Sequence, residues 1–496
     1  MKYGLSETII ESLQQVFETN AKVDKAFLFG SRAKGNYRDA SDIDMALKGQ
    51  DLTFDDILSL GVKLDDLNLP YKIDLLDYHT IKEPALQEHI DRVGIEFYSR
   101  WKEYKLDEVY DFASGLSKGA EEFGFGYEFL AFKDIFQNYF VPNKLTSLVN
   151  STEKERKSCS IKRGDVFLTR TSETDEDLGM SCVALKDYPE ATFNGFTKRL
   201  RPNGKIEIHP EYAGFYFRTP KFRFTVAGMS SVTTRASLNN SMLAQLTITI
   251  PPINEQKTIA DTLITLHNKT GLLQRQNKTL EQLAESLFRQ WFVEEAEDSW
   301  AVEKLGKVFD IGIGRTPPRK EQHWFTTNPN DIKWVSIKDM GISGIYIDTV
   351  SEYLTPQAVD AFSVPIIPEN TVMLSFKMTI GRLAISTEKM VSNEAIAHFK
   401  QKEGSSLFPE FLYLFLKTYS WVELGSTSSI VESINSQMIK EIEMIIPDKQ
   451  KLIDFKKMIK PIFDKIKSNQ TQIRTLTQTR DTLLPKLMSG EIRITP

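Results

Sequence analysis

Apolar residues recur at helical spacing in two long stretches of the chain. No proline interrupts residues 253–292, where apolar side chains return every three, four or seven positions. Residues 450–487 show a similar apolar spacing, although this stretch contains two prolines. At 1.5 Å per residue each helix would span roughly 55–60 Å. The two predicted stripes consist of Ile259, Leu263, Leu266, Leu273, Leu280, Leu283 and Leu287, and of Ile453, Ile459, Ile462, Ile466, Ile473, Leu476 and Leu483.

Such stripes favour packing of the two helices against each other as an antiparallel coiled coil, because each stripe alone would face water. An ordinary dimerisation coil would show the same periodicity. Pro461 and Pro485 are expected to kink the second helix or to mark its ends.

The sequence before each helix is a repeat. W-K-E-Y-K-L-D-E-V-Y-D-F-A-S-G from position 101 matches W-A-V-E-K-L-G-K-V-F-D-I-G-I-G from position 300, an offset of 199, which pairs Gly115 with Gly314. S-L-N-N-S-M-L-A-Q-L (237–246) matches S-I-N-S-Q-M-I-K-E-I (433–442) at an offset of 196, and Asn194 and Asn393 keep the offset of 199. The drift indicates a shared scaffold whose loops differ. The repeat favours intramolecular pairing of the helices, because each helix follows the same globular unit.

Short β-like runs broken by Gly, Pro and Asn fill both copies, including R-G-D-V-F-L-T-R (163–170) and E-N-T-V-M-L-S-F (369–376). The composition, with 41% hydrophobic and 26% charged residues, is that of a soluble globular protein. The two cysteines, Cys159 and Cys182, are too few for a disulfide framework, and no apolar run approaches the roughly 20 residues of a membrane span. The N-terminus lacks the apolar region of a signal peptide, so a cytoplasmic location is expected.

Charge separates the first hundred residues from the remainder. They hold 12 basic and 18 acidic residues, a balance of −6, against −5 for the whole chain. The remaining residues are therefore nearly neutral, which permits a locally basic face for nucleic acid without requiring one.

A candidate catalytic pattern lies in this acidic part. The run A-F-L-F (26–29) predicts a buried strand that ends at Gly30–Ser31, and Asp42 and Asp44 share one face of a second strand. The later strand Y-K-I-D-L-L-D-Y offers Asp74. Converging carboxylates favour Mg²⁺, and the glycine lets backbone amides approach a triphosphate, which suits metal-assisted nucleotidyl transfer. A glycine turn followed by a solvated acidic turn is the alternative.

The full set G-S-R-A-x-G, S-D-I-D and a flanked aspartate resembles the minimal nucleotidyltransferase domain of the polymerase-beta-like superfamily, over about residues 1–98. The resemblance implies that Gly30 and Ser31 hold the nucleotide phosphates and that Asp42, Asp44 and Asp74 bind metal and catalyse transfer. Mg²⁺ and a nucleoside triphosphate, expected to be ATP, are the implied cofactors. Family members found beside toxins adenylylate a protein, so an antitoxin-like activity is also implied.

Residues 100–496 resemble the specificity subunit of type I restriction–modification systems. The motifs that carry this resemblance are G-R-T-P-P-R-K with I-K-W-V-S-I-K-D-M, T-I-G-R-L-A-I-S, P-P-I-N-E-Q-K and T-R-D-T-L-L-P-K-L-M-S-G-E-I. The family implies two target-recognition domains that each read half of a bipartite double-stranded DNA site, in antiphage defence. Its helices set the spacer and dock modification subunits, and a restriction (motor) subunit joins the complex. The first copy departs from the pattern, with S-G-L-S-K-G-A-E-E-F in place of G-x-T-P.

The repeated part is expected to recruit chemistry and to have none of its own, since the sequence contains neither N-P-P-[YFW] nor G-x-x-x-x-G-K-[ST]. Basic residues in both copies are candidate DNA contacts, although a solvated surface role is the alternative for each. They are Arg163, Arg170, Lys198, Arg199 and Arg201 in the first copy, and Arg315, Arg319, Lys320, Lys338, Lys377 and Arg382 in the second.

The predicted fold is multidomain α+β: a nucleotidyltransferase α/β domain and two mixed α/β recognition domains separated by two long antiparallel coiled-coil helices. The nucleotidyltransferase domain is expected at residues 1–98, and the two recognition domains are expected at residues 100–250 and 296–446. The central spacer helix is expected at residues 251–295 and the C-terminal spacer helix at residues 447–496. An antiparallel layout would return the last helix towards the first recognition domain and so bring the added domain beside the C-terminal helix. One further hypothesis makes the protein primarily a nucleotidyltransferase targeted by its DNA-binding part. Another, an accidental fusion, predicts no effect of deleting residues 1–98.

Overall fold

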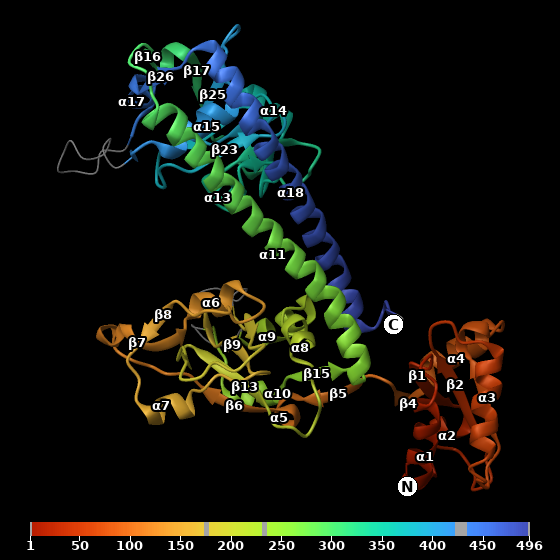
Figure 1. Cartoon of the computed structure of the whole chain (residues 1–496). Coiled ribbons are helices and arrows are strands. Elements are labelled where there is room, and N and C mark those ends of the chain that lie inside the picture. Colours follow the sequence, from red (N-terminus) through yellow and green to blue (C-terminus); the bar gives the residue numbers. More distant parts are fainter. Residues whose placement is uncertain (1, 173–177, 231–235, 422–433, 495–496) are drawn as a thin grey trace. The chain divides into compact units, whose positions relative to one another are not determined.

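The computed structural model describes residues 2–172, 178–230, 236–421 and 434–494 (Figure 1). The chain divides into two compact units, one formed by Met1–Ile264 with Thr482–Pro496 and the other by Thr265–Asp481. Among the helices of these described ranges, none combines the length and the apolar character needed to cross a membrane.

The first domain is a four-stranded sheet, ordered β3-β2-β1-β4, that packs against helices. Strands β1 and β2 are antiparallel, whereas β2 and β3 are parallel. Leu13, Phe17, Leu28 and Met45 lie in its core. Its main elements are α1 (Glu7–Glu18), β1 (Lys25–Phe29), α2 (Gly30–Lys34), β2 (Ile43–Lys48), α3 (Phe54–Asp65), β3 (Ile73–Asp77), α4 (Pro84–Val93) and β4 (Ile95–Ser99).

The first recognition domain combines a sheet ordered β11-β9-β13-β6 with a smaller sheet ordered β12-β7-β8. Strands β9, β11 and β12 are short and fully buried, as the apolar runs predict, whereas most of β7 is exposed. The elements up to the smaller sheet are β5 (Lys102–Lys105), α5 (Leu106–Val109), β6 (Tyr110–Ser114), β7 (Phe123–Leu130), α6 (Phe132–Gln137), β8 (Ser147–Val149) and α7 (Glu153–Ser158). The others are β9 (Val166–Thr169), β10 (Thr171–Ser172), β11 (Ser181–Val183), β12 (Thr192–Phe193), β13 (Thr197–Pro202), α8 (Pro210–Tyr216), α9 (Pro220–Ser230), β14 (Ala236–Ser237), α10 (Asn240–Gln245) and β15 (Thr247–Ile250).

The second recognition domain has the corresponding sheets, ordered β17-β25-β22-β23-β20 and β18-β21-β19-β24. Its first half contains β16 (Ala301–Lys304), α12 (Leu305–Val308), β17 (Phe309–Ile313), β18 (Phe325–Thr326), β19 (Ile332–Val335), α13 (Ile337–Ile342), β20 (Tyr346–Ile347), β21 (Glu352–Leu354) and α14 (Pro356–Ala361). Its second half contains β22 (Val372–Ser375), β23 (Leu383–Ser386), β24 (Val391–Ser392), β25 (Ile396–Gln401), α15 (Pro409–Thr418), α17 (Ser436–Glu441) and β26 (Glu443–Ile446).

The sequence repeat corresponds to the same contacts made twice. The Leu106 amide donates to the Leu246 carbonyl at 2.9 Å, and the Leu305 amide donates to the Ile442 carbonyl at 2.9 Å. A Cβ added to Gly115 would lie 2.2 Å from the Asn194 carbonyl oxygen, and one added to Gly314 would lie 2.2 Å from that of Asn393. Only glycine fits this approach, so the paired glycines and asparagines maintain one scaffold in both copies.

A long helix follows each copy of the repeat: α11 (Ile253–Arg289) follows the first and α18 (Lys449–Ser489) follows the second. Within the second unit they run antiparallel, because Phe288 packs on Phe455 while Asn277 hydrogen-bonds Asn469. A π-helical turn, Gln290–Glu294, extends α11. The predicted antiparallel pair is confirmed, and α18 runs through Pro461 and Pro485, so neither proline marks a helix end.

The predicted apolar stripes need two corrections. Leu283 and Ile453 are 47% and 39% exposed, whereas Leu452 and Phe455 are buried. The interface also contains a polar group: Asn469 is fully buried and donates to Gln276 at 2.9 Å and to Asn277 at 2.8 Å. A buried amide of this kind fixes the register of a helix pair, because any slip would leave it without partners.

Candidate functional site

The first candidate site lies where β1, β2 and β3 adjoin. Phe29 is the register partner of Asp44, and Asp44 is the partner of Asp74 on the parallel strand. Gly30 follows at φ +71°, and a Cβ there would lie 2.1 Å from the Asp44 Oδ2 atom. The sheet therefore brings the backbone of Gly30–Ser31 and two of the three predicted carboxylates together.

The electrostatics of the site reflect this crowding. Partial burial, followed by the charges of Asp74 and Asp42, raises the pKa of Asp44. Asp42 itself directly precedes β2 and is exposed. Lys72 forms an ion pair with Asp74 at 2.7 Å, and this contact raises the pKa of the lysine. Asp42, Asp44 and Asp74 thus form one acidic group that Lys72 partly neutralises.

Arg32 and Lys72 belong to the site, but the sequence prediction did not include them. The Arg32 guanidinium is buried and donates to the carbonyls of Ser41, at 2.7 Å, and Asp42, at 3.2 Å. It also lies over the Tyr71 ring, 4.6 Å from its centre. Arg32 therefore holds the turn that carries Asp42. Its position in the G-S-R-A motif is the sequence feature that could have identified it as a site residue.

A divalent cation suits the donor set, since burial and then the charges of Asp74 and Asp42 raise the pKa of Asp44, and hard cations take carboxylate oxygens. In the described ranges, no three acidic, histidine or cysteine side chains are yet arranged as metal ligands. A cation here would compete with Lys72 for Asp74. The three carboxylates therefore fit Mg²⁺ binding if the cation replaces Lys72 as the partner of Asp74.

The candidate DNA contacts of the first recognition domain have internal partners. Lys198 is buried and donates to Ser114 Oγ at 2.9 Å and to Asn240 Oδ1 at 2.8 Å, and burial lowers its pKa. Arg199 is buried and donates to the Ser160 carbonyl at 2.7 Å.

Arg201 binds the fully buried Asp165 through two hydrogen bonds, at 2.7 and 2.6 Å. Arg163 is more exposed and contacts Glu211 at 3.3 Å, while Arg170 is half-buried just after β9. The three residues on β13, which are Lys198, Arg199 and Arg201, thus stabilise the domain itself.

The second recognition domain presents its candidates more openly. Lys320, Lys338 and Lys377 are exposed. Arg315 donates to the Phe362 carbonyl at 2.6 Å and is otherwise exposed. Arg319 makes two 2.9 Å hydrogen bonds to Glu352 and stacks on the Phe325 and Trp334 rings, and Arg382 donates to the Ile337 carbonyl at 2.7 Å. Trp334, by contrast, is a core residue.

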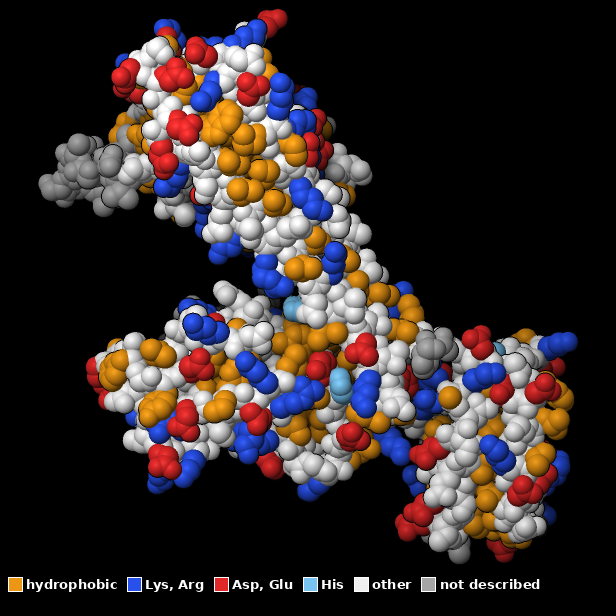
Figure 2. Space-filling view, viewed as in Figure 1, with side chains coloured by type: hydrophobic (Ala, Val, Ile, Leu, Met, Phe, Trp, Pro, Cys, Tyr) orange, Lys and Arg blue, Asp and Glu red, His pale blue; other side chains and the backbone are white. Residues whose placement is uncertain are grey.

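Basic side chains reach the surface of both units despite the net charge of −5. On the face shown in Figure 2 they are interspersed with acidic side chains.

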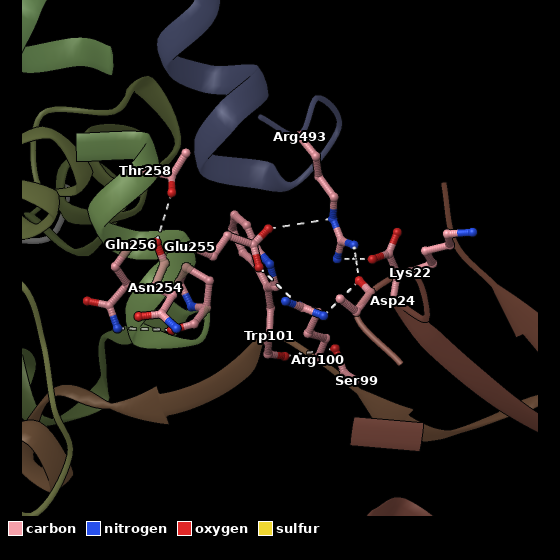
Figure 3. Close-up of polar contacts among 12 residues, drawn as sticks. Lys22, Asp24, Ser99, Arg100, Trp101, Asn254, Glu255, Gln256, Thr258 and Arg493 are labelled. Carbon is pink, nitrogen blue, oxygen red and sulfur yellow. Dashed lines mark hydrogen bonds and ion pairs between the residues drawn. The ribbon is translucent and has the colours of Figure 1, made fainter. Parts of the chain in front are cut away.

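A polar junction within the first unit joins the first domain to both long helices (Figure 3). Arg493, beyond the end of α18, forms an ion pair with Asp24, donates to the Ala21 carbonyl at 3.2 Å and approaches Glu255 of α11 at 3.5 Å. Arg100 also contacts Glu255, at 3.2 Å, and donates to the Ala21 carbonyl at 2.7 Å. Within this unit, the segment that follows α18 thus contacts the first domain through Arg493.

Comparisons with known proteins cover both parts of the chain. Residues 98–282 and 297–479 match the family model for the type I restriction modification DNA specificity domain, and residues 11–103 match that for polymerase beta, nucleotidyltransferase. The chain is 26% identical over 377 residues to the type I restriction enzyme MjaIX specificity subunit of Methanocaldococcus jannaschii, covering 70% of this chain and 82% of that protein.

A second relative is the HindI specificity subunit of Haemophilus influenzae. It is 23% identical over 474 residues, which cover 79% of this chain and all (100%) of that protein. The crystal structure of a type I restriction–modification S subunit from M. genitalium is 15% identical, covers 78% of this chain and 96% of that one, and has a TM-score of 0.49.

Proposed function

The chain belongs to the type I restriction–modification DNA specificity family, and from this membership we propose that it recognises a bipartite double-stranded DNA target for a restriction–modification complex. The observation that carries the proposal is the duplicated scaffold, in which the Leu106–Leu246 and Leu305–Ile442 contacts recur while the loops differ. Two related domains with different loops suit the reading of two different half-sites.

The helix pair supports a fixed spacing between the half-sites. Buried Asn469 fixes the register of α11 and α18, and a slip of one turn would leave its amide without partners. We expect the exposed polar faces of these helices to dock the modification subunits, with a restriction subunit joining the complex. The assembly would work in the cytoplasm.

Among the DNA-contact candidates, exposed residues fit the role better than buried ones. Lys320, Lys338 and Lys377 can reach phosphate or base edges without breaking an internal bond. Arg199 and Arg201 would have to abandon carbonyl and carboxylate partners. In the first recognition domain, the less buried Arg163 and Arg170 remain the better candidates, although Arg163 would have to release Glu211 and the Leu185 carbonyl.

Selection from a pool of random duplexes tests this function. The chain would be purified with its modification subunits, and bound DNA would be sequenced after several rounds. We expect two short conserved elements separated by a gap of fixed length. Uniform recovery of sequences would contradict the proposal.

A second activity, nucleotidyl transfer, is favoured by the convergence of Gly30, Asp44 and Asp74 at one edge of the first sheet. The chain's own groups would bind the triphosphate at Gly30–Ser31, and the carboxylates would hold Mg²⁺, which supplies Lewis-acid activation when bound. We propose a protein acceptor, as in antitoxin-like adenylylation, and ATP as the donor.

Labelled ATP, Mg²⁺ and the co-purified partners test this activity. Label transfer should be lost in Asp42→Asn and Asp44→Asn and kept in Asp39→Asn, a control that changes an exposed carboxylate in the preceding turn. Equal labelling by the wild type and the three variants would exclude catalysis by this acidic group.

A further inference from the structure

The hairpin between β22 and β23 presents an unusual residue at its tip. Met378 is 96% exposed and has φ +59°. The Thr379 amide donates to the Lys377 carbonyl at 2.6 Å, so Met378 is the central residue of a three-residue turn. Positive φ at the centre of such a turn is rare and strained for a residue with a side chain.

Neither the exposure nor the backbone conformation of Met378 contributes to stability. An exposed methionine gains nothing from burial, and the left-handed conformation is unfavourable for a methionine, which lacks the short polar side chain that helps Asn or Asp adopt it. Persistent strain of this kind occurs at sites that contact a ligand. The chain therefore presents an apolar side chain where a glycine would serve the fold better.

The loop is held firmly in this conformation. The Ser375 hydroxyl donates to the Thr379 carbonyl at 2.5 Å and accepts from the Arg382 amide at 3.1 Å. The Gly381 amide donates to the Ser375 carbonyl at 3.0 Å. Because the loop is already ordered, contact through Met378 would require little further loss of entropy.

The surroundings of Met378 combine positive charge with further apolar exposure. Lys377 precedes it, and Ile380, two residues later, is 44% exposed. The Arg382 guanidinium ties the loop to α13 by donating to the Ile337 carbonyl at 2.7 Å. That short helix carries exposed Lys338 and Ile342, the latter 77% exposed.

We propose that Met378 contacts base edges in the second half-site and reads the 5-methyl group of a thymine. This inference rests on the proposed DNA-recognition function. Duplex DNA is the occupant that the charges favour, since Lys377 beside Met378 and exposed Lys338 on α13 complement phosphates near an apolar contact. Thymine is the base that offers an apolar group in the major groove.

The test combines Met378 variants with removal of single thymine methyl groups. The complex with its modification subunits would be titrated with its selected target, in which each thymine of both strands is replaced in turn by deoxyuridine. We expect one position of the second half-site to weaken wild-type binding about three- to fivefold, the effect of one lost methyl contact. Met378→Ala should bind the intact target about as weakly as the wild type binds the target that lacks this methyl group. Removal of the methyl group should not weaken the binding of Met378→Ala further.

Two further variants separate a DNA contact from a folding defect. Met378→Gly relieves the backbone strain, so it should unfold at the same temperature as the wild type or higher while binding as weakly as Met378→Ala. Val302→Ala, which shortens an exposed apolar side chain on β16, away from the hairpin and from both long helices, should bind like the wild type.

The inference is overturned if no thymine methyl matters, or if its removal weakens Met378→Ala as much as the wild type. Failure of the wild type itself to select a gapped sequence would instead refute the proposed function. The two failures are thus distinguishable.

Discussion

Arg493 is expected to fasten the first domain to the helix pair. Its side chain is only 14% exposed and meets Asp24, which is 26% exposed, and Glu255, which is 13% exposed. Removing one partner of a buried ion pair typically costs about 3–5 kcal/mol. Glu255 keeps its contact with Arg100, so we expect Arg493→Ala to destabilise the junction by about 2–3 kcal/mol.

Hydrogen exchange measures this effect locally. Amides near Ala21 and Asp24 should exchange faster in Arg493→Ala, by the factor that corresponds to a loss of about 2–3 kcal/mol. The exchange rates of amides in the second recognition domain should not change. Lys457→Ala, which removes an exposed cation from α18, is the control.

A double-mutant cycle between Arg493→Gln and Asp24→Asn isolates the pair. We expect a coupling energy of about 1–3 kcal/mol. Additive effects, or unchanged exchange near Asp24 in Arg493→Ala, would refute the reasoning that this contact fastens the domain. The accidental-fusion hypothesis would then gain support.

Three further predictions concern other parts of the chain. Burial lowers the pKa of His398 from 6.5 to about 4, so the unfolded chain takes up a proton first on acidification. The second recognition domain should therefore lose about 3 kcal/mol between pH 6.5 and pH 4, as followed by denaturant unfolding, and His398→Leu should remove this dependence. Asp44→Asn should stabilise the first domain in chelator, because burial and the charges of Asp74 and Asp42, which raise the pKa of Asp44, no longer act once the charge is removed. In thermal unfolding, the same substitution should abolish stabilisation of this domain by Mg²⁺. Insertion of one heptad into each of α11 and α18 adds about 10.5 Å and should lengthen the gap in the selected DNA by at most about three base pairs, with both half-sites unchanged.

Local patterns in the sequence were sufficient for the main elements and the acidic group. The strand period and the position of Gly30 predicted that carboxylates and a glycine turn would meet, and Asp44 and Asp74 are register partners. The repeat predicted matched scaffolds because Gly115 and Gly314 each meet an asparagine carbonyl. These features depend on residues that are close in sequence or repeated.

Features that depend on distant partners could not be predicted in this way. The helical period alone did not decide between Ile453 and Leu452 for the buried face, because the phase follows from packing against α11 and α15. The sequence around Lys198 is compatible with an exposed surface cation. Its burial follows from the position of strand β13 inside its sheet, between β9 and β6. The role of Arg493 depends on Asp24, which lies at the other end of the chain.

Methylome sequencing of a host that carries or lacks this chain tests the central claim most directly. We expect one two-part motif with a gap of fixed length to be methylated only when the chain is present. Methylation that is identical with and without the chain, or that shows a single ungapped motif, would contradict bipartite DNA recognition by this chain.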